Sequence, residues 1–175
     1  SLSSEQLEQF ETFYDYMLEM NQVMNLTSIT DEDEVVLKHF FDSMSLINYY
    51  EVKNGSRVID VGTGAGFPGI PLAILLPNVH FTLMDSLNKR ILFLKDVVKK
   101  CGLNNVECIH SRAEELAKDM NYREQFDLCV SRAVANLSVL LEYCIPFINE
   151  SGIFISYKSE FSEEETDNAK KAIKV

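Results

Sequence analysis

Residues 57–71, RVIDVGTGAGFPGIP, decide the fold of this chain. A short run rich in β-branched residues, 57–61, opens into a stretch that holds four of the chain's seven glycines, at positions 62, 64, 66 and 69. Glycine adopts a positive φ at little cost and lets a ligand lie directly on the backbone. A strand that leads through such a turn into a helix is therefore predicted to bind a nucleotide.

The glycine pattern fits two classes of cofactor. Gly64 to Gly69 satisfies G-x-G-x-x-G, the fingerprint of dinucleotide-binding folds. Asp60 with Gly62, Gly64 and Gly66 satisfies the acidic-x-G-x-G-x-G pattern of methyltransferases that use S-adenosylmethionine. We favour the second class because its pattern includes the acid at the strand end, and its glycines begin directly after the strand. A glycine-rich turn without any ligand is the third interpretation.

Length and composition predict one soluble, cytoplasmic domain. The 175 residues are 46% hydrophobic and 25% charged, as in ordinary globular proteins. The sequence shows neither an apolar run long enough to cross a membrane nor a secretory signal. Its four cysteines lack C-x-x-C spacing and its three histidines are scattered, so we expect reduced thiols and no metal site.

The net charge of −11 is concentrated at the start of the chain. Residues 1–52 hold 11 of the 27 acidic residues and one of the 16 basic residues, Lys38. This acidity argues against a general nucleic-acid coat protein. It leaves room for a local basic face on residues 89–100, although such a cluster is more often a solvated helix surface.

From residue 57 onward, the pattern alternates between strands and helices. We predict strands at 57–61, 79–84, 106–109, 126–130 and 152–157, with helices at 69–76, 88–101, 113–120 and 136–145. Such alternation predicts a Rossmann-like, doubly wound and mostly parallel sheet, which binds ligands beyond the carboxyl ends of its strands. Residues 1–54 form an N-terminal helical segment, with a loop at 21–29, and residues 55–175 form the nucleotide-binding core. We expect the two to form one compact domain, with a last helix at 160–175.

Three strand ends carry candidate site residues. Asp85 ends the second strand, 23 residues beyond Gly62, where an acid can accept both hydroxyls of a ribose. Ala113 and Glu114 follow the third strand, beside the expected position of an adenine ring. Arg132 follows the fourth strand, where a transferred methyl group would lie. The structural alternatives are a helix cap for Asp85, an ordinary helix start for residues 112–114 and a surface position for Arg132.

Five segments together resemble one family. They are NLTSI (25–29), HFFDS (39–43), residues 60–71, LMDS (83–86) followed by Lys89 and Arg90, and SRA (131–133). In this order, over roughly residues 7–160, the chain resembles the bacterial small-subunit ribosomal RNA guanine-N7 methyltransferases, also called the glucose-inhibited division protein B family. The resemblance implies a seven-stranded methyltransferase fold. It also implies transfer of a methyl group from S-adenosyl-L-methionine to N7 of one guanine in 16S ribosomal RNA.

The resemblance also implies roles for individual residues. Gly62 and Phe67, together with Gly64 of the glycine pattern, match the cofactor loop, and Ala113 and Glu114 match the adenine side. Arg132 matches the arginine near the transferred methyl, while Asn25 and Lys158 match polar positions that face the substrate. The chain has Tyr157-Lys158-Ser159 where the family often has Leu-Lys-Gly, which weakens the match at Lys158. No residues follow to form the final antiparallel hairpin, so we expect a chain that stops before it.

The implied partners are 16S ribosomal RNA, within the small ribosomal subunit, and no membrane or metal, for a protein expected to be a monomer. A methyltransferase acting on a small molecule or a protein is an alternative, as is a non-catalytic cofactor-binding module. An NAD-dependent oxidoreductase is disfavoured because none of the three histidines follows a strand end near the glycine loop.

Overall fold

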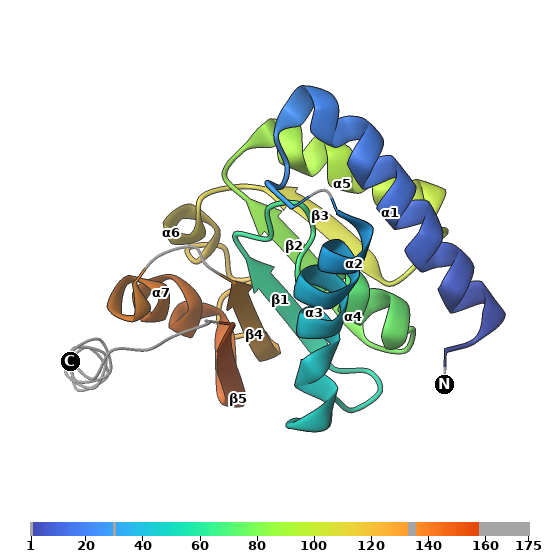
Figure 1. Ribbon diagram of the computed structural model, residues 1–175. Coiled ribbons are helices and arrows are strands. Elements are labelled where there is room, and N and C mark those ends of the chain that lie inside the picture. Colours follow the sequence, from blue (N-terminus) through green and yellow to red (C-terminus); the bar gives the residue numbers. More distant parts are fainter. Residues whose placement is uncertain (1, 30, 133–135, 158–175) are drawn as a thin grey trace.

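The computed structural model describes residues 2–29, 31–132 and 136–157. Its centre is a parallel sheet in the order β3-β2-β1-β4-β5 (Figure 1). The strands are β1 (Arg57–Val61), β2 (His80–Asp85), β3 (Val106–His110), β4 (Phe126–Arg132) and β5 (Ile148–Tyr157). The register pairs Asp60 of β1 with Leu83 on one side and with Val130 on the other. The predicted doubly wound sheet is confirmed.

Both faces of the sheet are covered by helices, which explains why the central strands are apolar almost throughout. Val58, Leu83 and Val130 belong to one buried cluster, and Ile59 and Met84 belong to the other. Helices α1 (Ser4–Met24), α4 (Gly69–Leu75) and α5 (Asn88–Lys100) lie on the first side, and α6 (Ala113–Leu116) and α7 (Leu137–Cys144) on the second (Figure 1).

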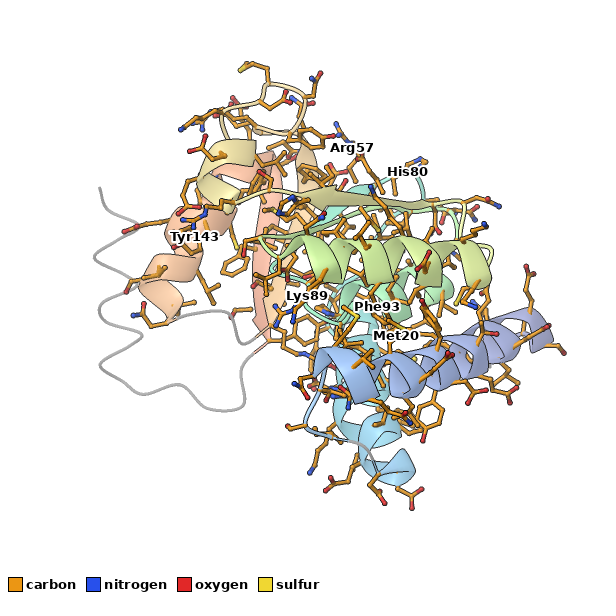
Figure 2. All side chains as sticks on the ribbon, turned by 90° about the horizontal axis from the view of Figure 1, so that it is seen from above. Met20, Arg57, His80, Lys89, Phe93 and Tyr143 are labelled. Carbon is orange, nitrogen blue, oxygen red and sulfur yellow. The ribbon has the colours of Figure 1, made fainter. Side chains whose placement is uncertain are left out.

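The N-terminal helices pack against the core rather than standing apart from it. Helix α1 begins with a capping box, in which the Ser3 side chain accepts from the Gln6 amide and the Gln6 side chain accepts from the Ser3 amide. Met20 of α1 and Phe93 of α5 lie where the two helices face each other (Figure 2). The second helical stretch runs through α2 (Glu32–Val35), the π-helical η1 (Val36–Phe41), α3 (Asp42–Met44) and the 3₁₀ turn η2 (Ser45–Asn48).

Side-chain hydrogen bonds join this segment to the ends of core elements. Gln6 Nε2 donates to the carbonyl of Ile74 at 2.9 Å, and Gln9 Nε2 donates to that of Cys101 at 3.0 Å. Both carbonyls lie at helix C-termini, where backbone acceptors lack partners within the helix. The N-terminal segment therefore completes the hydrogen bonding of α4 and α5.

Several predicted boundaries were wrong. Residues 21–24 belong to α1 and not to a loop, β4 extends to Arg132, and β5 begins at Ile148 instead of at residue 152. The short 3₁₀ turn η3 (Ile145–Phe147) connects α7 to β5. The predicted helix at 160–175 lies outside the described residues. Within the described part of the chain, no helix is long and apolar enough to cross a membrane.

Candidate active site

Asp60 is a buried carboxylate that holds the glycine loop, residues 62–69, in place. Its side chain is fully buried, and its Oδ2 accepts hydrogen bonds from Thr63 Oγ1 at 2.7 Å and from the Gly69 amide at 2.9 Å. Gly69 must be glycine because a Cβ there would collide with Leu83 and with the Asp60 carboxylate. Burial raises the pKa of Asp60 to about 6, and its Oδ1 has no partner among the described residues.

Asp85 faces the upper side of the same loop. The residue is 3% exposed, and its carboxylate accepts from the amides of Gly64 at 3.0 Å and Leu87 at 2.9 Å. Arg90 Nη1 approaches it at 3.3 Å. Gly64 adopts a φ of +62°, which turns its N–H toward Asp85. Asp85 therefore fixes the glycine loop and the turn that leads into α5. The alternative of a helix cap is not borne out, because the N-cap of α5 is Leu87, without a side-chain cap hydrogen bond.

Two cavities meet at Asp85. The larger has a volume of about 360 Å³ and extends over the glycine loop toward the N-terminal segment and Arg132. The smaller, of about 170 Å³, lies on the side of Ala113 and Glu114. Gly62, Asp85 and Ser86 line both. A ligand with two arms and a central ribose would therefore place its hydroxyl groups beside Asp85.

The structure brings all of the predicted cofactor residues to these cavities. Gly62, Gly64 and Phe67 line the larger cavity, and Ala113 and Glu114 line the smaller. Tyr143 of α7 also lines the smaller cavity, although nothing in the sequence pattern had singled it out. Its helix covers the second face of the sheet, so only the packing of α7 brings it near the third strand.

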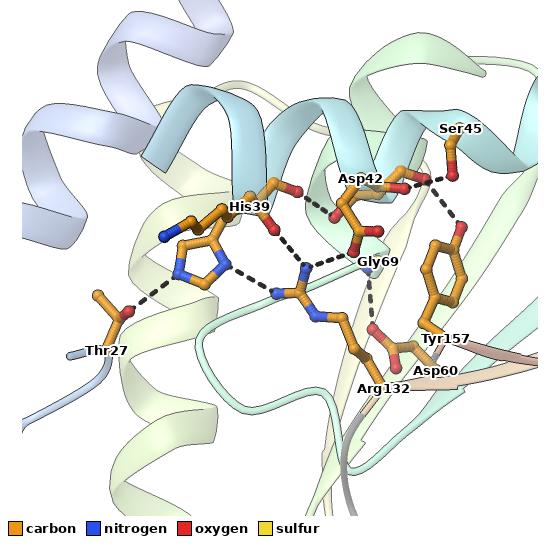
Figure 3. A network of polar contacts seen from close by, with 10 residues as sticks. Thr27, His39, Asp42, Ser45, Asp60, Gly69, Arg132 and Tyr157 are labelled. Carbon is orange, nitrogen blue, oxygen red and sulfur yellow. Dashed lines mark hydrogen bonds and ion pairs between the residues drawn. The ribbon is translucent and has the colours of Figure 1, made fainter. Parts of the chain in front are cut away.

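Arg132 is the last residue of β4, and the structure excludes the alternative of a free surface side chain. Its Nη1 donates to Asp42 Oδ2 at 3.1 Å and to the Lys38 carbonyl at 3.4 Å, and its Nη2 donates to His39 Nδ1 at 3.2 Å (Figure 3). The guanidinium carbon lies 5.0 Å from the centre of the Phe67 ring, within cation–π range. Arg132 thus joins the end of the fourth strand to the N-terminal segment and to the glycine loop.

His39 lies between Arg132 and Thr27. Its ring stacks on Phe67 with centroids 4.6 Å apart, and its Nε2 lies 2.9 Å from Thr27 Oγ1 (Figure 3). A guanidinium can only donate, so His39 Nδ1 must accept and the ring proton must be on Nε2. Burial and the nearby Arg132 charge lower the pKa of His39 to about 4, which keeps the ring neutral at pH 7.

His39, Thr27 and Asp42 were not among the predicted site residues. Two quoted motifs, NLTSI and HFFDS, contain all three, but sequence reasoning gave them no role at the site. The expectation concerned histidines at strand ends near the glycine loop, and His39 belongs instead to η1. Its ring nevertheless reaches Phe67 of the loop, through the packing of η1 against it.

The structure does not bring the predicted substrate residue Asn25 to the cavities. Asn25 is the C-cap of α1, with a φ of 50°, a left-handed conformation that asparagine tolerates well. It is exposed and lines neither cavity, whereas the next two residues, Leu26 and Thr27, line the larger one. Lys158 lies outside the described residues. The substrate roles of Asn25 and Lys158 therefore stay predictions.

The sequence matches a known protein family over almost its whole length. Residues 6–175 match the model of the family described as rRNA small subunit methyltransferase G. The chain is 53% identical, over 168 residues, to the ribosomal RNA small subunit methyltransferase G of Thermoanaerobacter sp. (strain X514), which covers 96% of this chain and 70% of that protein. The protein of the same name from Lachnoclostridium phytofermentans is 51% identical over 172 residues, which cover 98% of this chain and 71% of the relative.

Solved structures support the fold at much lower sequence identity. A SAM-dependent O-methyltransferase from Thermotoga maritima superposes with a TM-score of 0.61 and 16% identity, over 90% of this chain and 55% of the other. A coclaurine N-methyltransferase, solved with N-methylheliamine and SAH bound, gives a TM-score of 0.54 and 14% identity, over 85% of this chain and 52% of that one.

Proposed function

The chain belongs to the rRNA small subunit methyltransferase G family, and on this premise we propose that it methylates N7 of a guanine in 16S ribosomal RNA. S-adenosylmethionine is the methyl donor. The observation that carries the proposal is the pair of cavities that meet at Asp85, with Arg132 lining the larger one.

The residues around the cavities fit S-adenosylmethionine. Asp85 is a buried carboxylate at the junction of the cavities, where the two hydroxyls of a ribose need acceptors. The smaller cavity is flanked by Ala113, Glu114 and Tyr143, which suit an adenine ring through one aromatic side chain and one carboxylate. The glycine loop borders the larger cavity without side chains at Gly62 and Gly64, so a ligand can approach its backbone.

The chain's own groups then have to align and shield the reactants. The bound cofactor supplies a methyl group that its sulfonium already activates. Guanine N7 carries an in-plane lone pair and no proton, so the protein needs no general base. Consistent with this, both ring nitrogens of the neutral His39 are engaged, by Arg132 and by Thr27. The site therefore accelerates transfer by orientation and by exclusion of water.

Arg132 retains donors for a ligand. Three of its five N–H groups point to Asp42, Lys38 and His39, and among the described residues none accepts from the remaining one on Nε and one on Nη2. Two neighbouring N–H groups suit a pair of anionic oxygens, from a cofactor carboxylate or a substrate phosphate. We propose that Arg132 holds such a group at the methyl side, with Phe67 supporting its guanidinium from below.

Further roles and partners belong to the same proposal. We assign Gly62, Gly64, Phe67, Asp85, Ala113 and Glu114 to the cofactor, and Asn25 and Lys158 to the RNA. The substrate is 16S ribosomal RNA in the small subunit of the cytoplasmic ribosome, and the protein acts as a monomer without a metal. Residues 1–54 and 55–175 fold together as one domain.

Transfer of tritium from labelled S-adenosylmethionine tests this function against its rivals. The acceptors are small ribosomal subunits from cells that lack this methylation, and RNA and protein are separated after the reaction. We expect label in 16S RNA alone. Label in ribosomal protein, or in neither fraction despite cofactor binding, would favour a protein or small-molecule methyltransferase or a non-catalytic module.

A further inference from the structure

Thr27 is held rigidly at the wall of the larger cavity. Its amide donates to Asn21 Oδ1 at 2.9 Å, and its carbonyl accepts from Asn21 Nδ2, also at 2.9 Å. One side-chain amide thus fixes both backbone groups of Thr27. Since Asn21 lies in α1, the last turns of this helix position the threonine.

The hydrogen bonds around Thr27 Oγ1 determine where its proton can go. The ring of His39 must donate from Nε2, because Arg132 occupies Nδ1 as a donor (Figure 3). The Ile29 amide donates to the same oxygen at 3.1 Å. A hydroxyl has two lone pairs and one proton, so both acceptor positions of Thr27 are filled. No described residue accepts its proton, and Thr27 is therefore an obligate donor beside the cavity.

We propose that Thr27 is a specificity-determining residue, whose hydroxyl donates to O6 of the target guanine. This inference rests on the proposed function and names the group that recognises the base. O6 is adjacent to N7, so a hydrogen bond to O6 holds the base while the N7 lone pair stays free for the methyl. Adenine carries an amino group at the same position. Two donors would then face each other, because Thr27 has no lone pair left to accept.

Charge matching favours O6 over the carboxylate of the cofactor as the acceptor. Arg132 lines the same cavity and has two N–H groups that no described residue engages, so an anionic group gains most by binding there. A neutral hydroxyl donor suits a neutral carbonyl-like oxygen. The lowered pKa of His39 is part of the same arrangement. A protonated ring would carry an N–H on Nδ1, and this N–H would face the N–H of Arg132.

A cycle of two changes, one in the enzyme and one in the base, tests the proposal. Small subunits are reconstituted with either guanine or 2-aminopurine at the methylated position; the latter keeps N7 and lacks O6. Single-turnover rates are measured for the wild type, Thr27→Val and Thr27→Ser. The preference for guanine is the rate on guanine divided by the rate on 2-aminopurine. Thr27→Val loses the hydrogen bond to O6, so its preference should be roughly tenfold lower than that of the wild type. Thr27→Ser keeps the hydroxyl and should retain the wild-type preference. The different reactivity of N7 in the two bases cancels in this comparison.

The other outcomes overturn the proposal in distinct ways. If Thr27→Val slows both substrates by the same factor, Thr27 only supports His39. If Thr27→Val instead weakens binding of S-adenosylhomocysteine in calorimetry and leaves the base preference unchanged, the hydroxyl serves the cofactor. Absence of transfer to guanine by the wild type would contradict the proposed function itself, apart from any role of Thr27.

Discussion

At the scale of single residues, two carboxylates on adjacent strands have different surroundings and different tasks. Asp60 is closed off beneath the glycine loop and lines neither cavity, while Asp85 is buried but lines both. Asp60 accepts from Thr63 and Gly69, so its contribution is to the shape of the loop. Asp85 has the position for a ligand contact.

The raised pKa of Asp60 gives a testable dependence of stability on pH. Because its folded pKa is about 6 and its unfolded pKa is near 3.8, the folded state favours the protonated form. The contribution of this group to the free energy of unfolding is fully present below pH 4 and is lost as the pH rises through 6. Between pH 5 and pH 8, urea unfolding of the wild type should show a loss of about 1–2 kcal/mol from this group.

Asp60→Asn is the matched variant, since it keeps the size of the side chain but does not titrate. From pH 5 to pH 8, its free energy of unfolding relative to that of the wild type should rise by about 1–2 kcal/mol. The opposite contribution of His39, whose lowered pKa favours folding as the pH rises from 4 to 6.5, is present in both proteins and cancels. A constant difference between them would show that Asp60 does not titrate in this range.

Asp85→Ala should weaken binding of S-adenosylhomocysteine by about 1.5–3 kcal/mol, as expected for lost hydrogen bonds to a charged group. Asp85→Asn retains one acceptor oxygen and should lose less. Isothermal titration calorimetry measures the affinity, and thermal unfolding controls for the released amides of Gly64 and Leu87. Unchanged affinity in a folded Asp85→Ala variant would show that Asp85 only holds the glycine loop and the turn at Leu87.

The sequence was informative about this site where the signals were local. The glycine spacing and the acid 23 residues beyond Gly62 predicted the loop and Asp85 because each depends on one strand end. The contact between His39 and Arg132 joins positions that are 93 residues apart. No periodicity or spacing encodes such a contact, so only the packing of η1 against the glycine loop reveals it.

At the scale of elements, an aromatic cluster fixes the N-terminal helices over the cofactor loop. Phe13 of α1 lies 5.8 Å from Phe40 of η1 and 5.2 Å from Phe67, measured between ring centroids. Phe67 also stacks on His39 and lies below Arg132. The N-terminal helices and the glycine loop are therefore packed against each other through one cluster of aromatic rings.

Phe13→Ala should destabilise the fold by about 3–5 kcal/mol, because the Phe13 side chain is fully buried and the substitution leaves a cavity. Phe41→Ala is the control on the second helical stretch, since Phe41 is 59% exposed and should change stability by less than about 0.5 kcal/mol. Urea unfolding measures both variants. A loss of stability in Phe13→Ala as small as that expected for Phe41→Ala would show that α1 contributes little to the core.

Element types were predictable and their ends were not. The alternation of apolar runs and turn residues predicted five strands in the observed order along the chain. The start of β5 at Ile148 was missed because Gly152, taken as its beginning, lies inside it, beside an irregularity in the register with β4. Gly152 is close to the carbonyls of Phe126 and Asp127, and a Cβ there would collide with the first.

At the scale of the whole molecule, side-chain hydrogen bonds join the acidic N-terminal segment to the core. Tyr157 at the end of β5 donates to the carbonyl of Ser43 at 2.8 Å, and Arg132 pairs with Asp42. Together with the hydrogen bonds of Gln6 and Gln9, these bonds join the segment to the ends of β4 and β5 and to the C-terminal ends of α4 and α5.

We therefore predict one cooperative unfolding transition for the two segments. Circular dichroism and tyrosine fluorescence should give coincident urea curves, as a two-state domain requires. Addition of S-adenosylhomocysteine should shift both curves together. Two separated transitions, with only one of them sensitive to the ligand, would show that residues 1–54 fold independently.

Nucleoside analysis of the product RNA tests the central claim most directly. Unmethylated small subunits are incubated with S-adenosylmethionine and either the wild type, Arg132→Ala or Arg132→Lys, and the digested 16S RNA is analysed by mass spectrometry. We expect one 7-methylguanosine per RNA with the wild type, a partial yield with Lys, and almost none with Ala, because a point charge replaces the planar fork incompletely. A methyl group on another atom or base, or a full yield with Arg132→Ala, would contradict the account.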